Sequence, residues 1–248
     1  MELSIRKPSK FLYFTEAIRA TFDFWKCMYF LAFYRHKKID DSHPIVVVPG
    51  FLGSDLSTIL LRWFIKKQGF TEVHGWELGR NLGHLEVIPL LSEKVESLYQ
   101  KNQQKVTLIG WSLGGVFTRE IAKQKPQIVN QLITLGSPFA NIDAPNNALW
   151  IYRFFNDVKK IDQALKAQLP VAAPVPTTAI YSKQDGVVPW QACIEPTEDA
   201  THENIEVKSS HLGFAVNKSV FKIIIRKLRN TFSKKEKGLL SDTESNLH

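Results

Sequence analysis

The residue with the clearest chemistry in this 248-residue chain is Ser112, which lies within Gly110-Trp111-Ser112-Leu113-Gly114. The apolar run at 106–109 predicts a buried strand, and the glycine and apolar residues at 115–117 predict the start of a helix. The two glycines indicate a turn too tight for side chains on either side of the serine. Such a turn projects the hydroxyl into a cleft, above helix N–H groups that can stabilise negative charge. The motif therefore predicts a nucleophile; a helix-capping serine between two turn glycines is the structural alternative.

A serine hydroxyl becomes a nucleophile when a base takes its proton and an acid orients that base. Asp185 lies in a loop after a predicted strand, where Gly186 allows a sharp turn and residues 187–189 are apolar. His211 lies between the last predicted strand and the closing helix, whereas His202 precedes that strand. Open α/β sheets gather their sites at the carboxyl ends of strands, so Asp185 and His211 can meet Ser112 there. A solvated turn aspartate and a surface histidine are the alternatives.

Composition limits the other classes of function. The hydrophobic fraction of 44% supports a sizeable core. Cys27 and Cys193 lie far apart, without a partner at metal-ligand spacing, so we expect neither a disulfide framework nor a zinc site. Reduced thiols predict a cytoplasmic protein.

The net charge is +8, with eight basic residues and one acid in 218–237, which favours anionic partners such as phospholipid headgroups. The alternative is a solvated helix face, and without a recognisable motif nucleic acid is not expected as a partner.

The first 43 residues form a separate aromatic-rich segment. Seven apolar residues repeat at three- and four-residue spacing and so share one helix face: Phe11, Phe14, Ile18, Phe22, Trp25, Tyr29 and Phe33. The run is too short to cross a bilayer, and basic residues flank it at 6, 7 and 10 and again at 35, 37 and 38. Two interpretations remain open: a helix packed on the domain, or an anchor that contacts the inner face of a membrane through residues 11–34.

The remaining chain alternates strand and helix patterns, which predicts an α/β domain at 44–230 with a mostly parallel sheet of about six strands and helices on both faces. Strands are predicted at 44–48, 69–74, 106–110, 131–136, 178–181 and 204–208, and helices at 56–68, from Ser92, at 114–124 and at 216–228. An irregular insert occupies 139–176. Residues 231–248 are polar and predict a disordered tail.

Several of these motifs occur together in one known family. The set comprises Pro-Gly-Phe at 49–51, Gly-Trp-Ser-Leu-Gly-Gly at 110–115, Leu-Gly-Ser-Pro at 135–138, Asp185-Gly-Val-Val and Ser-His211. As a set they resemble bacterial lipase- and esterase-type α/β-hydrolases over roughly residues 44–230. The resemblance implies an α/β-hydrolase fold, a triad in the chain order Ser112, Asp185, His211, and no metal or organic cofactor. The two antiparallel strands that fuller members place before residue 45 are missing here.

The resemblance also implies how substrate is held. The backbone N–H groups of Leu113 and Phe51 are the expected oxyanion donors. The apolar insert at 139–169 is the expected short helical lid over the serine. The substrate-binding candidates are Leu52, Trp111 and Pro138 in or beside the motifs, Trp150 in the insert, and Arg80 in the glycine-rich loop at 75–83, which is expected to reach the same rim as Ser112. Arg80 pairing with a nearby acid is the structural alternative for that residue.

Together these features predict a serine hydrolase that cleaves small-molecule carboxylic esters, hydrophobic or lipid-like, through an acyl-enzyme. The same three residues would serve a thioesterase, an amidase or an acyltransferase. A membrane-associated interaction protein without catalysis is the alternative from another class. The sequence leaves the oligomeric state open.

Overall fold

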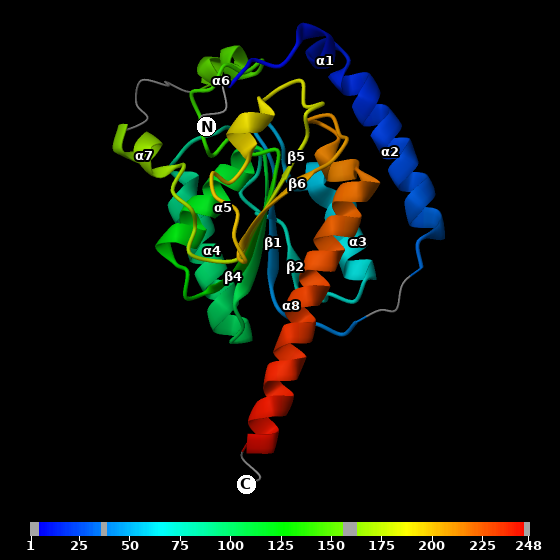
Figure 1. The fold of residues 1–248 in the computed structure, drawn as a ribbon, viewed down its shortest axis with the longest axis vertical. Helices are drawn as coiled ribbons and strands as arrows, with labels where there is room; N and C mark the ends of the chain where they lie inside the picture. Colours follow the sequence, from blue (N-terminus) through cyan, green and yellow to red (C-terminus); the bar gives the residue numbers. More distant parts are fainter. Residues whose placement is uncertain (1–4, 36–38, 156–162, 246–248) are drawn as a thin grey trace.

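A parallel sheet forms the centre of the molecule, as Figure 1 shows for the computed structural model. The sheet has six strands. The structure describes residues 5–35, 39–155 and 163–245. The strand order is β2-β1-β3-β4-β5-β6, and all neighbouring pairs are parallel. The strands are β1 (Ile45–Val48), β2 (Val73–His74), β3 (Val106–Trp111), β4 (Val129–Leu135), β5 (Thr177–Tyr181) and β6 (His202–Glu206). The predicted α/β-hydrolase architecture of about six strands is confirmed.

Helices cover both faces of this sheet. The α-helices are α1 (Lys10–Phe14), α2 (Glu16–Phe33), α3 (Ile59–Lys67), α4 (Val87–Asn102), α5 (Leu113–Gln124), α6 (Leu149–Phe155), α7 (Gln163–Gln168) and α8 (Lys218–Ser245). Short 3-10 helices are η1 (Asp55–Thr58), η3 (Trp190–Cys193) and η4 (Phe214–Val216). Helices α4 and α5 pack on one face, and α2, α3 and α8 lie on the other, as the two halves of Figure 1 show.

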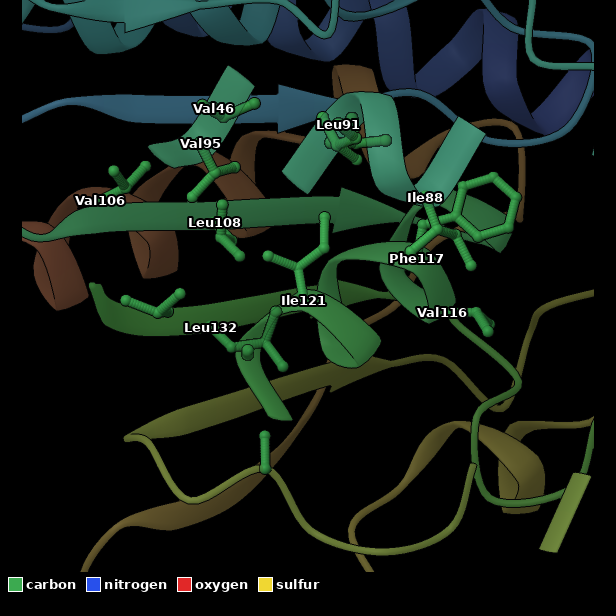
Figure 2. Close-up of a cluster of buried hydrophobic side chains, with 14 of the residues drawn as sticks. Val46, Ile88, Leu91, Val95, Val106, Leu108, Val116, Phe117, Ile121 and Leu132 are labelled. Carbon is green, nitrogen blue, oxygen red and sulfur yellow. The ribbon is translucent and has the colours of Figure 1, made fainter. Parts of the chain in front are cut away.

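The continuous apolar run of β1 explains why both faces are covered. All four of its residues are buried. Side chains alternate across a strand, so Val46 and Val48 join the core under α4 and α5, while Ile45 and Val47 join the core under α3 and α8. Figure 2 shows the first of these cores, with Leu91 of α4 and Phe117 of α5 packed over the sheet.

The strand order places the crevice of the sheet beside β1. From β1 the chain passes through α3 to β2 on one side, then through α4 to β3 on the other side of β1. The loops that leave β1 and β3 therefore diverge at their carboxyl ends, which is where open α/β sheets bind ligands. Ser112 directly follows β3 at this point.

Two predicted boundaries are corrected by the structure. Helix α4 begins at Val87, not at Ser92, and Ser92 is buried within the helix. Pro89 suggests a break in the sequence, but the first turn of a helix accepts proline because its N–H groups have no intrahelical acceptor. Helix α8 continues to Ser245 and so includes most of residues 231–248, for which a disordered tail is predicted; residues 246–248 lie outside the described part of the chain. Lysine, glutamate and leucine, which are good helix formers, are frequent in this segment.

The N-terminal segment packs on the domain, but with the face opposite to its aromatic repeat. Cys27 is fully buried, and Phe30, Leu31 and Tyr34 pack against the core under α3 and α8. The seven repeated apolar residues, from Phe11 to Phe33, are each 60% to 75% exposed. Within the described parts of the chain, no helix has the length and apolar character needed to cross a membrane.

Candidate active site

Ser112 sits on a strained turn between β3 and α5. Its φ of 52° and ψ of −123° place a residue with a side chain in a region that normally favours glycine. Close packing fixes this turn: a Cβ on Gly114 would lie 2.5 Å from the carbonyl oxygen of Pro49. Glycine at 114 therefore lets the start of α5 approach the loop after β1, as the motif predicts.

The structure brings the three predicted catalytic side chains together. Nε2 of His211 lies 2.9 Å from Oγ of Ser112, and Nδ1 of His211 lies 2.6 Å from Oδ2 of Asp185. The other carboxylate oxygen of Asp185 accepts hydrogen bonds from the N–H groups of Val187 and Val188, at 2.8 and 2.9 Å. Asp185 and His211 are buried, and Ser112 is partly exposed. These contacts form one continuous chain from carboxylate through imidazole to hydroxyl.

The surroundings of His211 favour its protonated form. Burial lowers the pKa of this imidazole, but the charge of Asp185, its hydrogen bond and the charge of Glu16 together raise the pKa above its ordinary value. Trp111 also holds the histidine, because its indole N–H donates to the carbonyl oxygen of His211 at 3.2 Å. A neutral imidazole with its proton on Nδ1 can donate to Asp185 and accept the hydroxyl proton of Ser112 on Nε2.

The two predicted oxyanion donors belong to residues that line one cavity with Ser112. Phe51, Leu113 and Pro138 all contribute to this cavity of about 80 Å³. Leu113 is the first residue of α5, so its N–H has no intrahelical acceptor and is available to an oxyanion. Buried Asn81 fixes the loop that carries Phe51, donating from Nδ2 to the Pro49 carbonyl and from its backbone N–H to the Gly53 carbonyl.

Helix α6 covers this cavity from the insert. The rings of Tyr152 and Phe155 lie 5.3 and 6.0 Å from the ring of Phe51, and the Tyr152 hydroxyl donates to the carbonyl oxygen of Gly83 at 3.3 Å. Ile142 and Leu149 add further apolar surface to the cavity wall. Residues of the insert between 139 and 155 therefore line the mostly apolar cavity beside Ser112.

The five predicted substrate-binding residues have different positions. Pro138 lines the cavity. Leu52 has a φ of 61° and accepts a hydrogen bond from the exposed Arg80, whose side chain therefore braces the loop after β1. Trp111 contacts His211, and the Trp150 side chain is 66% exposed. Among the described residues, Leu52, Arg80, Trp111 and Trp150 are not part of the wall of the 80 Å³ cavity.

Sequence reasoning missed one residue near the site, Glu16 of α2. Its buried carboxylate accepts hydrogen bonds from the N–H groups of Gly186 and Leu212, next to the predicted acid and base. A signal was present, since Glu16, Asp23 and Cys27 share the helix face opposite to the aromatic repeat. Because the aromatic face is exposed, the face that carries Glu16 and Cys27 is the one that packs on the domain.

The two cysteines are free and buried. Burial, together with the charge of Asp23, raises the pKa of the Cys27 thiol to about 11. Burial and the charge of Asp185 raise the pKa of the Cys193 thiol well above its ordinary value. Both thiols therefore stay protonated at neutral pH, which makes them poor nucleophiles. In the ranges 5–35, 39–155 and 163–245, no group of three or more His, Cys, Asp or Glu side chains is arranged to hold a metal ion.

Solved hydrolase structures share this fold. Aspergillus fumigatus lipase B is 17% identical, with a TM-score of 0.56 over 73% of this chain and 50% of its own. The mature Bacillus licheniformis lipase BlEst2 is 16% identical, with a TM-score of 0.55 over 78% of this chain and 96% of its own. A pyrethroid hydrolase from Sphingobium faniae is 14% identical, with a TM-score of 0.53 over 75% of this chain and 96% of its own. The chain thus spans half of the fungal lipase and nearly all of the bacterial enzymes, and it shares the fold of these hydrolases.

The family can be stated more narrowly. Residues 66–189 match the family described as the PGAP1-like alpha/beta domain, and the chain belongs to that family. The matched segment contains Ser112 and Asp185 and ends before His211. No curated protein sequence matches the chain.

Proposed function

We propose that this chain is a serine hydrolase that cleaves carboxylic esters. The hydrogen-bonded chain from Asp185 through His211 to Ser112, beside an apolar cavity, carries this proposal. A protein that served only for interaction would have no need of a strained serine held 2.9 Å from a buried imidazole. The lipase-like fold of the solved neighbours supports the same class of reaction by analogy.

The reaction proceeds as two acyl-transfer steps. His211 takes the proton of Ser112 while its Oγ attacks the ester carbonyl carbon, and the N–H groups of Phe51 and Leu113 stabilise the oxyanion. The C–O bond to the leaving alcohol then breaks, and His211 returns the proton to that oxygen. A water molecule, deprotonated by His211, attacks the acyl-enzyme, and the carboxylic acid leaves as Ser112 regains its proton. Asp185 holds the imidazole in place and stabilises its charged form throughout.

The cavity favours hydrophobic acyl groups. Its walls include the apolar side chains of Phe51, Pro138, Ile142 and Leu149, with Tyr152 of the lid above them. The space of about 80 Å³ holds a short acyl chain, and an outward movement of α6 would make room for a longer one. We therefore propose small-molecule esters with an apolar acyl chain as substrates.

The test is covalent labelling of Ser112 by a fluorophosphonate probe. We expect the wild-type protein to be labelled, Ser112→Ala to lose the label and His211→Ala to label far more slowly. The matched control is Ser97→Ala, an exposed serine of α4, which keeps the label. A folded wild-type protein that resists the probe would refute the proposal. Rates on p-nitrophenyl esters, thioesters, anilides and added alcohols then separate an esterase from a thioesterase, an amidase and an acyltransferase.

We also propose that α1 and α2 contact an anionic phospholipid bilayer at the inner face of the membrane. The exposed aromatic repeat of Phe11, Phe14, Ile18, Phe22, Trp25, Tyr29 and Phe33 forms what we name the docking face. An apolar groove of about 390 Å³ between α2 and α3, lined by Met28, Ile59 and Trp63, continues this surface. Arg6, Lys7, Lys10, Lys26 and Arg35 are exposed around it, so its charge complements anionic headgroups.

Vesicle co-sedimentation tests this contact. We expect wild-type protein to bind phosphatidylglycerol-containing vesicles better than pure phosphatidylcholine, with less binding in high salt. Phe22→Glu with Trp25→Glu should weaken binding by about 10-fold or more, because both side chains lose their place in the interface. The matched control is Leu90→Glu, an apolar residue of α4 that is 50% exposed on the other side of the sheet. Equal binding of the double variant and the wild type would refute the contact.

A further inference from the structure

One buried carboxylate joins the two loops that carry the predicted acid and base. Oε1 of Glu16 accepts a hydrogen bond from the N–H of Gly186 at 2.8 Å, and Oε2 accepts one from the N–H of Leu212 at 3.1 Å. Gly186 directly follows Asp185, and Leu212 directly follows His211. Glu16 is 4% exposed, although it comes from α2, far from both loops in the sequence.

A second side chain of α2 fixes that carboxylate. Arg19 donates from Nη2 to Oε1 of Glu16 at 2.8 Å and from Nη1 to the carbonyl oxygen of Gln184 at 2.6 Å. The guanidinium therefore holds Glu16 in place and bonds to the residue that precedes Asp185. A charge pair at a partly buried site, in which both partners also form hydrogen bonds with backbone groups of the neighbouring loops, fixes position more firmly than an exposed pair does.

The backbone of α1 touches the same loop directly. A Cβ on Gly186 would lie 2.4 Å from the carbonyl carbon of Leu12, so glycine is required for this close approach. Asn147, at the start of the lid, donates from Nδ2 to the carbonyl oxygens of Gly186 and Pro8, at 2.8 and 3.2 Å. The N-terminal segment, the lid and the acid loop thus meet at Gly186.

We propose that Glu16 is a positioning residue, through which the N-terminal helices hold Asp185 and His211 within hydrogen-bond reach of Ser112. This inference rests on the proposed hydrolase function. Asp185 and His211 both lie on loops, and their contact depends on the relative position of those loops. The carboxylate of Glu16 accepts hydrogen bonds from the residue after Asp185 and from the residue after His211. This shared partner fixes the position of one loop relative to the other.

The charge of Glu16 also acts on His211, which provides a readout that a purely structural role would not change. The charged groups around the imidazole are Asp185 from the loop after β5, and Glu16 with its partner Arg19 from α2. Asp23 of α2 lies against Gly213, two residues beyond the histidine. Glu16 is among the groups that raise the pKa of His211, so its neutralisation lowers that pKa.

Three variants test the proposal: Glu16→Gln, Glu16→Asp and the control Glu93→Gln, an exposed glutamate of α4. The assay is hydrolysis of a soluble p-nitrophenyl ester across pH, with the active fraction counted by fluorophosphonate labelling. We expect Glu16→Gln to lower kcat per labelled site by ~10- to 100-fold with KM nearly unchanged, since a small misplacement of catalytic groups has effects of this size. The acid limb of its pH profile should move to lower pH.

Glu16→Asp separates charge from reach. Its carboxylate keeps the charge but is one methylene too short to accept from both loops, so kcat should fall while the acid limb stays near its wild-type position. Glu93→Gln should match the wild type in every measurement. Thermal unfolding of each variant shows whether it is folded, and NMR titration of the His211 imidazole gives its pKa without turnover.

The outcomes separate this proposal from the hydrolase proposal. Wild-type protein that is neither labelled nor active refutes the hydrolase function itself. A folded Glu16→Gln protein whose kcat, acid limb and His211 pKa equal those of the wild type overturns the positioning role. A Glu16→Gln protein with a smaller folded fraction but with the wild-type kcat per labelled site also overturns the positioning role, because Glu16 would then contribute only to stability.

Discussion

Replacing Asp185 by asparagine tests the geometry of the site most sharply. Asp185 accepts the Nδ1 proton of His211 through Oδ2 and two backbone N–H groups through Oδ1. An asparagine can keep its amide oxygen on those two backbone donors. Its NH₂ group then points at Nδ1 of His211, which must become an acceptor. The imidazole proton moves to Nε2, and the base that faces Ser112 at 2.9 Å is lost.

The size of the effect follows from this change of tautomer. A triad with the wrong tautomer loses about 10⁴-fold in kcat, which corresponds to about 5.5 kcal/mol of transition-state stabilisation. The variant also loses the carboxylate charge that raises the pKa of His211, so the residual activity should persist to lower pH. Backbone hydrogen bonds to residue 185 survive, and thermal stability should therefore change much less than activity.

The assay is kcat and KM on a soluble p-nitrophenyl ester, with unfolding followed by circular dichroism. Asp199→Asn is a matched control because Asp199 also pairs with a histidine, His202. His202 is the first residue of β6, so this pair lies at the amino ends of the strands, away from Ser112. We expect the control to keep wild-type kcat. A folded Asp185→Asn protein with more than a tenth of wild-type kcat, or an equal loss in the control, would refute the assignment of Asp185 as the orienting acid.

Three further predictions concern protonation and stability. In the proposed mechanism His211 is a base only when neutral, and its pKa is raised, so kcat/KM measured from pH 5 to 9 should fall towards acid with a midpoint above that of a free imidazole. Cys27, with a pKa of about 11, and Cys193 should not react with a thiol reagent at pH 8 in the native protein, and both should react after denaturation. Arg119→Met should lower the free energy of unfolding in urea by about 3–5 kcal/mol, because it leaves the carboxylate of Glu195 buried without its partner.

The parts of the site that could be predicted were those with local signatures. The turn at Ser112 needs glycines at fixed offsets, a strand before it and a helix after it, and all of these are visible within residues 106–117. Asp185 and His211 were found because each follows a strand, and parallel strands bring their carboxyl ends to one edge. The even alternation of strand and helix patterns likewise predicted a parallel sheet of about six strands, whereas the strand order is seen only in the structure.

The parts that could not be predicted depend on contacts between distant segments. The aromatic repeat predicted one helix face, but the structure divides it at Thr15, with Phe11 and Phe14 in α1 and the other five residues in α2. Periodicity alone also does not say whether an apolar face is buried or exposed. Leu12, Glu16 and Arg19 contact loops more than 160 residues away, and no local pattern encodes those hydrogen bonds. The start of α4 at Val87 was missed because Ser92 has the type of a helix cap. Tertiary packing of the preceding turn, where Ile88 and Leu91 are buried, overrides that local signal.

The position of α2 also decides how membrane binding must be tested. Deletion of residues 1–35 would remove the docking face, but it would also remove the carboxylate of Glu16 from the N–H groups of Gly186 and Leu212. It would in addition expose apolar surface, because Phe30 packs on Phe64, which stacks on Phe221 of α8. A truncated protein that lost both vesicle binding and activity would therefore show neither role. Substitutions on the outer face at Phe22 and Trp25 change only the membrane contact, and Glu16→Gln changes only the inner face.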